Sequence, residues 1–105
     1  MTQTSSLAAR ARVLVSAAEL QSMLAAGVAP LLLDVRWQLT GPREAGRAAY
    51  RAGHLPGARF IDLETVLTGP AAQPALGRHP LPDAQRLAAG LAAAGVDARQ
   101  PLLVY

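Results

Sequence analysis

The sequence contains no cysteine and no lysine, and it has few aromatic residues. Without cysteine the chain forms no disulfide, gives no thiolate ligand to zinc or an iron–sulfur cluster, and carries no thiolate nucleophile. Two histidines, His54 and His79, are too few for a metal site of the usual kind, and we expect neither a bound metal nor a cofactor. No apolar run approaches the roughly 20 residues of a membrane-spanning helix, so we expect no membrane partner.

The charge pattern argues against nucleic acid as a partner. The net charge is +3, and all ten basic residues are arginines scattered singly between Arg10 and Arg99. Nucleic-acid surfaces gather basic side chains on one face and add aromatic rings for stacking. With 4% aromatic residues and no basic run, the chain is expected to bind no nucleic acid.

The length of 105 residues allows one domain with a modest core, because much of the 51% hydrophobic content is alanine, which buries little area. Residues 1–12 combine Ser, Thr, Ala and Arg without an acidic residue, as organellar transit peptides do. These residues lack an apolar stripe, which favours a disordered N-terminal tail. The expected domain therefore covers residues 13–105, and the expected compartment is the cytoplasm.

Strand-like and helix-like patterns alternate along the chain, which predicts an α/β fold. Ser16 and Glu19 form a capping box that predicts the start of a helix, and Gly27 is suited to end it. Thr68–Pro80 is predicted to be a loop. The predicted elements are a strand Val13–Val15, a helix Ala17–Ala26, a strand Leu31–Val35, one or two helical turns within Glu44–Ala52, a strand Ala58–Ile61, a helical turn Asp62–Leu67, a helix from Pro82 and Asp83 to Gly95 whose apolar stripe packs on the sheet, and a strand Leu102–Tyr105.

Polar residues follow the apolar run Leu31–Val35 directly, at Asp34, Arg36 and Trp37. An uninterrupted apolar run is typical of a parallel strand that is covered on both faces. The carboxyl edge of an open α/β sheet is where ligands bind, so these residues are candidates for a site. Further along, the segment GHLPGA at 53–58 predicts a sharp turn, because Pro56 restricts φ and Gly57 allows positive φ.

Three segments together resemble the first domain of a two-domain rhodanese-type sulfurtransferase, the family of thiosulfate and 3-mercaptopyruvate sulfurtransferases. They read DVRW at 34–37, YRAGHLPGARFIDL at 50–63 and GRHPLPD at 77–83. The GHLPGA turn occurs in any rhodanese domain, and its combination with DVRW and FIDL favours the first of two tandem domains. The resemblance implies a rhodanese-like open parallel sheet with helices on both faces. Because the sequence stops inside its last predicted strand, we expect an incomplete, C-terminally truncated N-terminal domain.

The resemblance also implies a reaction and its partners. In this family a Cys thiolate takes the outer sulfur of thiosulfate or 3-mercaptopyruvate as a persulfide and passes it to cyanide or a thiol. The catalytic Cys of tandem members belongs to the C-terminal rhodanese domain, so this chain is expected to be inactive alone and to form the other wall of the cleft. Two alternatives stay open: a non-catalytic rhodanese-like binding or regulatory module, and a single-domain rhodanese cut before its Cys.

Two residues are candidates for the substrate cleft. The resemblance implies that Trp37 lines it as an apolar wall, whereas partial burial under the following loop is the structural alternative. Arg36 is suited to hold an anionic sulfur donor by paired hydrogen bonds. Its structural alternative is an ion pair with Asp34 or Glu44.

Two further residues are candidates for an accessory role. His54 is interpreted either as fixing the turn by a hydrogen bond to backbone or as a relay of protons, with Glu44 as its acidic partner. In mercaptopyruvate-type relatives a His at this turn has been given such a role. His79 is predicted to be structural, and Asp62 and Glu64 are interpreted as a helix cap without chemistry.

Overall fold

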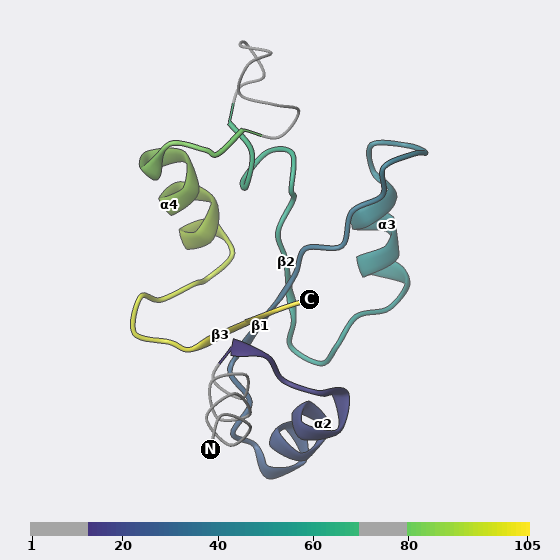
Figure 1. Cartoon of the computed structure of the whole chain (residues 1–105), viewed down its shortest axis with the longest axis vertical. Coiled ribbons are helices and arrows are strands. Elements are labelled where there is room, and N and C mark those ends of the chain that lie inside the picture. The colour runs from purple at the N-terminus through teal and green to yellow at the C-terminus, as the bar shows by residue number, and fades with distance from the viewer. Residues whose placement is uncertain (1–12, 70–79) are drawn as a thin grey trace, which may run out of the picture.

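The computed structural model describes residues 13–69 and 80–105, which contain one parallel sheet and three helices (Figure 1). The strands β1 (Leu31–Asp34), β2 (Arg59–Phe60) and β3 (Leu102–Val104) lie in the order β2-β1-β3. The helices α2 (Ala17–Ala26), α3 (Ala45–Ala52) and α4 (Ala84–Ala93) alternate with them along the chain. The predicted α/β class is confirmed, and Figure 1 shows α3 and α4 flanking the strands on opposite sides.

β1 is the central strand, which explains its uninterrupted apolar run. It pairs in parallel with β2, where Asp34 is level with Phe60, and with β3, where Leu32 is level with Leu103. Leu32, Leu33 and Asp34 are buried as predicted, because β1 has a strand on each side and Leu20 of α2 packs with Leu32. β1 therefore fixes the position of the polar residues that follow it.

The helix α2 begins and ends where its capping residues predict. The Ser16 side chain accepts a hydrogen bond from the Glu19 backbone N–H at 3.1 Å. Gly27 ends the helix with φ 71°, a left-handed conformation that suits glycine. Leu20, on this helix, is buried in a cluster with Leu32 of β1 and Ala58, and Leu24 packs against that cluster. The apolar positions of α2 therefore face the central strand.

The helices α3 and α4 also lie where they were predicted. Asp83 caps α4 by accepting from the Arg86 backbone N–H at 2.7 Å. No residue of α4 is buried, and Gly90 faces Val66, on the turn after β2, so closely that an added Cβ would lie 2.4 Å from a Val66 methyl carbon. α4 thus meets that turn through Gly90 and Arg86 and buries no side chain, whereas packing of its apolar stripe on the sheet was expected.

The core of the described residues is small and centres on β1. Its fully or nearly fully buried apolar side chains are Leu20, Leu32, Leu33, Ala58 and Ile61. Tyr50, Leu55, Leu103 and Tyr105 pack around this group while keeping part of their surface exposed. A core of this size, in which few large side chains are fully covered, stabilises a fold only modestly.

The predicted strand Val13–Val15 is wrong. None of these residues is in a strand, and Val13 and Leu14 are 81% and 57% exposed. Strand-forming residues need a hydrogen-bonded neighbour, and here the segment only borders an open pocket beside Leu102–Val104 without pairing with it. The predicted helical turn Asp62–Leu67 forms a hydrogen-bonded turn, from the Val66 N–H to the Asp62 carbonyl, without becoming a helix.

Two predictions lie outside the described residues. They are the tail at 1–12 and most of the loop at 68–80, including His79. In the part of the chain that is described, no helix combines the length and the apolar character that a membrane crossing needs.

Candidate functional site at the carboxyl edge of the sheet

The carboxyl ends of β1 and β3 lie side by side and bring Asp34 next to Tyr105. The Tyr105 N–H donates to the Leu33 carbonyl at 3.0 Å, and its own carbonyl accepts from the Val35 N–H at 2.8 Å. The Asp34 side chain is completely buried. A polar group at this depth requires partners, since an unpaired buried charge is costly.

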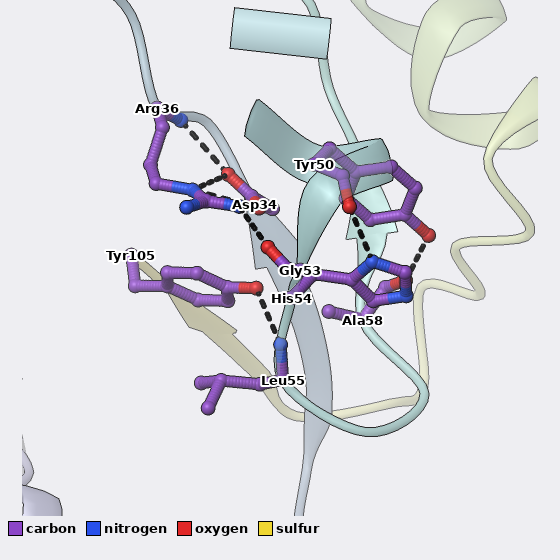
Figure 2. Close-up of polar contacts among 8 residues, drawn as sticks. All are labelled: Asp34, Arg36, Tyr50, Gly53, His54, Leu55, Ala58 and Tyr105. Carbon is purple, nitrogen blue, oxygen red and sulfur yellow. Dashed lines mark hydrogen bonds and ion pairs between the residues drawn. The ribbon is translucent and has the colours of Figure 1, made fainter. Parts of the chain in front are cut away.

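Arg36 supplies those partners, as Figure 2 shows. Its Nε lies 3.1 and 3.0 Å from the two Asp34 carboxylate oxygens, its Nη2 lies 2.7 Å from Oδ2, and its backbone N–H donates to Oδ1 at 3.0 Å. Nη2 also donates to the Gly53 carbonyl at 2.7 Å. The structural alternative for Arg36, an ion pair with Asp34, is therefore present, and binding of an anionic donor stays a prediction.

The pKa values at this edge follow from that pairing. Burial works against the charged form of Asp34, but the hydrogen bonds and charge of Arg36 outweigh it and hold the Asp34 pKa below its usual value. The hydrogen bond and charge of Asp34 in turn raise the pKa of Arg36. Burial raises the pKa of the Tyr105 phenol, and the negative charge of Asp34 adds to the effect.

The GHLPGA turn is held by two tyrosines, Tyr105 directly after β3 and Tyr50 on α3 (Figure 2). The Leu55 N–H donates to the Tyr105 hydroxyl at 3.0 Å, and the Tyr50 hydroxyl donates to the Ala58 carbonyl. Gly57 has φ 77°, which confirms the predicted need for glycine in the turn. The turn is thus fixed relative to the ends of β1 and β3.

His54 lies on this turn with its ring stacked on Tyr50, and the ring centroids are 3.8 Å apart. Its Nδ1 lies 2.7 Å from the Tyr50 carbonyl oxygen. Because a carbonyl only accepts, Nδ1 carries the proton in this contact, and Nε2 is then the basic nitrogen of the neutral ring. The hydrogen bond to backbone expected of a structural His54 is present, and a proton relay stays a prediction.

The structure does not pair Glu44 with His54. Glu44 precedes α3, is 72% exposed and lies 3.6 Å from Arg47 in an ion pair. His54 has its contacts with Tyr50. Their predicted partnership therefore has no support in the side-chain contacts, although both residues flank α3.

Trp37 lies partly buried in the loop after β1, as its structural alternative predicts. The indole Nε1 donates to the Glu64 carboxylate at 3.3 Å. Trp37 and Glu64 line an open pocket of about 250 Å³, together with Gln38, Leu39, Gly41, Pro42, Arg43, Ala45 and Gly46. Among the described residues, no group of three or more His, Asp or Glu side chains could hold a metal ion.

Comparisons with known proteins identify relatives that match most of the chain. It is 45% identical over 97 residues, 92% of its length, to a Mycobacterium tuberculosis protein named "Putative thiosulfate sulfurtransferase SseB". It is 41% identical over 75 residues to a Pseudomonas aeruginosa protein named "Probable 3-mercaptopyruvate sulfurtransferase". Over most of its length the chain is thus homologous to proteins named as thiosulfate or 3-mercaptopyruvate sulfurtransferases.

The chain covers only part of the length of these relatives. It spans 33% of the length of the mycobacterial protein and 26% of the Pseudomonas protein, and it is 30% identical to a mitochondrial thiosulfate/3-mercaptopyruvate sulfurtransferase of Arabidopsis thaliana, of which it spans 18%. Neither the family models nor the solved structures gave a match.

Two residues at this edge have contacts that the sequence did not predict. Glu64 was interpreted as part of a cap, yet its carboxylate contacts Trp37 and Arg43. Tyr105 was counted only as part of a strand, yet it connects the turn to the Asp34 pair. The sequence held a signal for the contact of Glu64 with Trp37. A half-buried indole N–H needs a hydrogen-bond acceptor, and few acidic residues are near the loop.

Proposed function

We propose that this chain is the first, non-nucleophilic domain of a sulfurtransferase that moves sulfane sulfur from thiosulfate or 3-mercaptopyruvate to cyanide or a thiol. The observation that carries the proposal is the 45% identity over 92% of a chain that itself contains no cysteine. Sulfur transfer of this type needs a thiolate. In the proposal, that thiolate belongs to a C-terminal rhodanese domain of the same polypeptide.

The proposed cycle conserves atoms and charge in two displacements. The Cys thiolate attacks the outer sulfur of the donor, which forms a persulfide and releases sulfite from thiosulfate or pyruvate from 3-mercaptopyruvate. Cyanide or a thiol then attacks the terminal sulfur of the persulfide and takes it up, giving thiocyanate or a new persulfide. The Cys thiolate is the leaving group and is thereby restored. Nothing in these steps needs a metal ion or a cofactor.

In the proposal, the residues after β1 form the wall of the cleft opposite the thiolate. Trp37 supplies an apolar surface that excludes water from the persulfide, and its place in the lining of an open pocket supports this role. The Arg36 side chain is 40% exposed even while it pairs with Asp34, which leaves part of its surface open to an anionic donor. Asp34 holds the guanidinium in one orientation, which lowers the entropy lost on binding.

His54 has a smaller part in the proposal. The hydrogen bond of Nδ1 to the Tyr50 carbonyl leaves Nε2 to accept or return a proton near the partner domain's thiol. We keep Glu44 as a proposed accessory acid because of the family resemblance alone. In the structure its carboxylate contacts Arg47 and not His54. The proposed compartment is the cytoplasm, which fractionation of cells expressing the parent protein tests.

The parent gene separates this proposal from its two alternatives. A tandem enzyme requires a Cys in a later rhodanese domain, and a single-domain enzyme requires one within a few residues after Tyr105. A binding or regulatory module requires a Cys in neither place. Assays of the parent protein for thiocyanate formation complete the test: we expect activity with thiosulfate or 3-mercaptopyruvate, and its loss when the downstream Cys is replaced by Ser. Activity that survives this replacement contradicts the proposal.

A further inference from the structure

Trp37 lies in the segment that connects β1 to α3, where the chain has no regular secondary structure from Val35 to Glu44 apart from bends and a turn. Backbone hydrogen bonds to neighbouring strands or helix turns do not fix such a segment as they fix β1. The orientation of the indole therefore depends on contacts made by its side chain. One of these contacts is the hydrogen bond from Nε1 to Glu64.

Glu64 lies on a segment that is held firmly by comparison. Its own N–H donates to the Asp62 carboxylate at 2.9 Å, and the Val66 N–H donates to the Asp62 carbonyl at 3.0 Å. The Thr68 hydroxyl closes the turn on the Leu63 carbonyl at 2.7 Å. Both ends of the turn are buried, at Ile61 and Thr68. The backbone that carries Glu64 is thus fixed to the end of β2.

The Glu64 carboxylate contacts two donors from the loop after β1. Oε1 accepts from the Trp37 indole at 3.3 Å, while Oε2 lies 3.4 Å from Arg43 Nε. These donors come from opposite ends of the irregular segment, and each uses a different oxygen. From this geometry we infer that Glu64 is a positioning residue, which holds the Trp37 ring against the pocket and keeps the loop closed on the turn after β2.

The charges fit this assignment. Arg43 balances the negative charge of Glu64, so the carboxylate can face the indole without an uncompensated charge beside an aromatic ring. The Glu64 side chain is 36% exposed, which makes the ion pair with Arg43 weak in itself. The role of Glu64 is therefore geometric, and its removal should change the environment of Trp37 more than the stability of the fold.

The placement of Trp37 by Glu64 is a property of this chain, and only its consequence for catalysis rests on the proposed function. Trp37 is the sole tryptophan, so fluorescence excited selectively at tryptophan reports this one ring. For Glu64→Ala we expect a shift of the emission to longer wavelength and a rise in quenching by acrylamide. Glu64→Gln keeps an acceptor oxygen for the indole, so its emission spectrum should stay close to that of the unsubstituted chain.

Glu44→Ala is the matched control, because Glu44 is an acidic residue at the same loop whose ion pair is with Arg47. It should leave the emission unchanged. The inference is overturned by an unchanged spectrum in Glu64→Ala, by an equal shift in Glu44→Ala, or by a Gln variant that behaves like the Ala variant. Circular dichroism verifies folding. If Glu64→Ala unfolds, Glu64→Asp replaces it: the shorter side chain withdraws the carboxylate from the indole, so a rise in quenching supports the inference and no change refutes it.

Kinetics of the parent enzyme separate the inference from the proposed function. If Trp37 lines the cleft, Glu64→Ala raises KM for the sulfur donor more than it lowers kcat, and Glu64→Gln restores most of the loss. A fluorescence shift without a change in KM supports the positioning by Glu64 and contradicts the cleft role of Trp37.

Discussion

Asp34 is completely buried and is bound by Arg36, two residues later, through the backbone N–H, Nε and Nη2 of that arginine. The same chain repeats this arrangement at its surface, where Arg99 donates to Asp97 from the same three groups. There the Asp97 side chain is 47% exposed and the Arg99 side chain is 90% exposed. The two pairs share geometry and differ in burial, so they are matched probes of what burial adds.

We predict that Asp34→Asn destabilises the chain by about 2 kcal/mol, because the change removes a buried carboxylate charge that accepts several hydrogen bonds from Arg36. Asp97→Asn should have a much smaller effect, since water replaces the lost contact at an exposed pair. Urea unfolding followed by circular dichroism measures both. Equal losses from the two variants would show that burial of Asp34 has no energetic role.

The Asp34 pair also predicts how stability depends on pH. The pKa of Asp34 is lower in the folded state than the value of about 3.9 in an unfolded chain. As the pH falls, the unfolded state therefore binds the proton first. The free energy of unfolding is therefore highest above about pH 4 and falls as acidification proceeds toward the lower, folded pKa. A series of unfolding curves at decreasing pH measures this fall. In Asp34→Asn the fall should be shallower, and an identical pH profile would refute the assignment.

Gly46 determines how closely α3 approaches the end of β1. A Cβ added there would lie 2.4 Å from the Arg36 carbonyl oxygen, a contact that backbone must move to relieve. We expect Gly46→Ala to cost about 1–3 kcal/mol, although alanine usually favours a helix. Gly53→Ala is the control, because its added Cβ meets no atom within 4 Å and its φ of 175° is extended. If thermal unfolding shows both variants equally stable, this packing account is wrong.

Trp37→Ala in the parent protein tests the proposed wall of the cleft. We expect a higher KM for the sulfur donor with the fold intact, because an apolar surface next to the bound donor is lost. Steady-state thiocyanate formation gives KM and kcat, and circular dichroism verifies the fold. Unchanged kinetics would reject the cleft role.

Local signals in the sequence predicted the helices well. The Ser16–Glu19 pair, Gly27 and Asp83 are caps whose hydrogen bonds involve residues within a few positions, so the chain segment alone determines them. The buried strand was equally clear, because its central position requires an apolar run. The strand at 13–15 failed since a strand depends on a distant neighbour, which no local pattern specifies.

The site was predicted less completely than the fold. Asp34, Arg36 and the GHLPGA turn were singled out, and the structure brings them together through Gly53 and Tyr105. The sequence left Arg36 to pair with Asp34 or Glu44, and the structure pairs it with Asp34. The contacts of Glu44 with Arg47, and of Glu64 with Trp37 at a separation of 27 positions, were not predicted. Such pairs depend on the path of irregular loops, and that path is set by packing.

We propose that the sulfur-carrying thiolate of the parent protein lies outside these 105 residues, which contain no cysteine. The most direct test of this proposal is to incubate the parent protein and this chain separately with thiosulfate or 3-mercaptopyruvate, locate any persulfide by mass spectrometry, and then add cyanide. We predict a persulfide on a Cys of a later domain of the parent protein, and neither persulfide nor thiocyanate from this chain alone. Thiocyanate formed by the isolated chain, or a parent protein that forms no persulfide, would contradict the account.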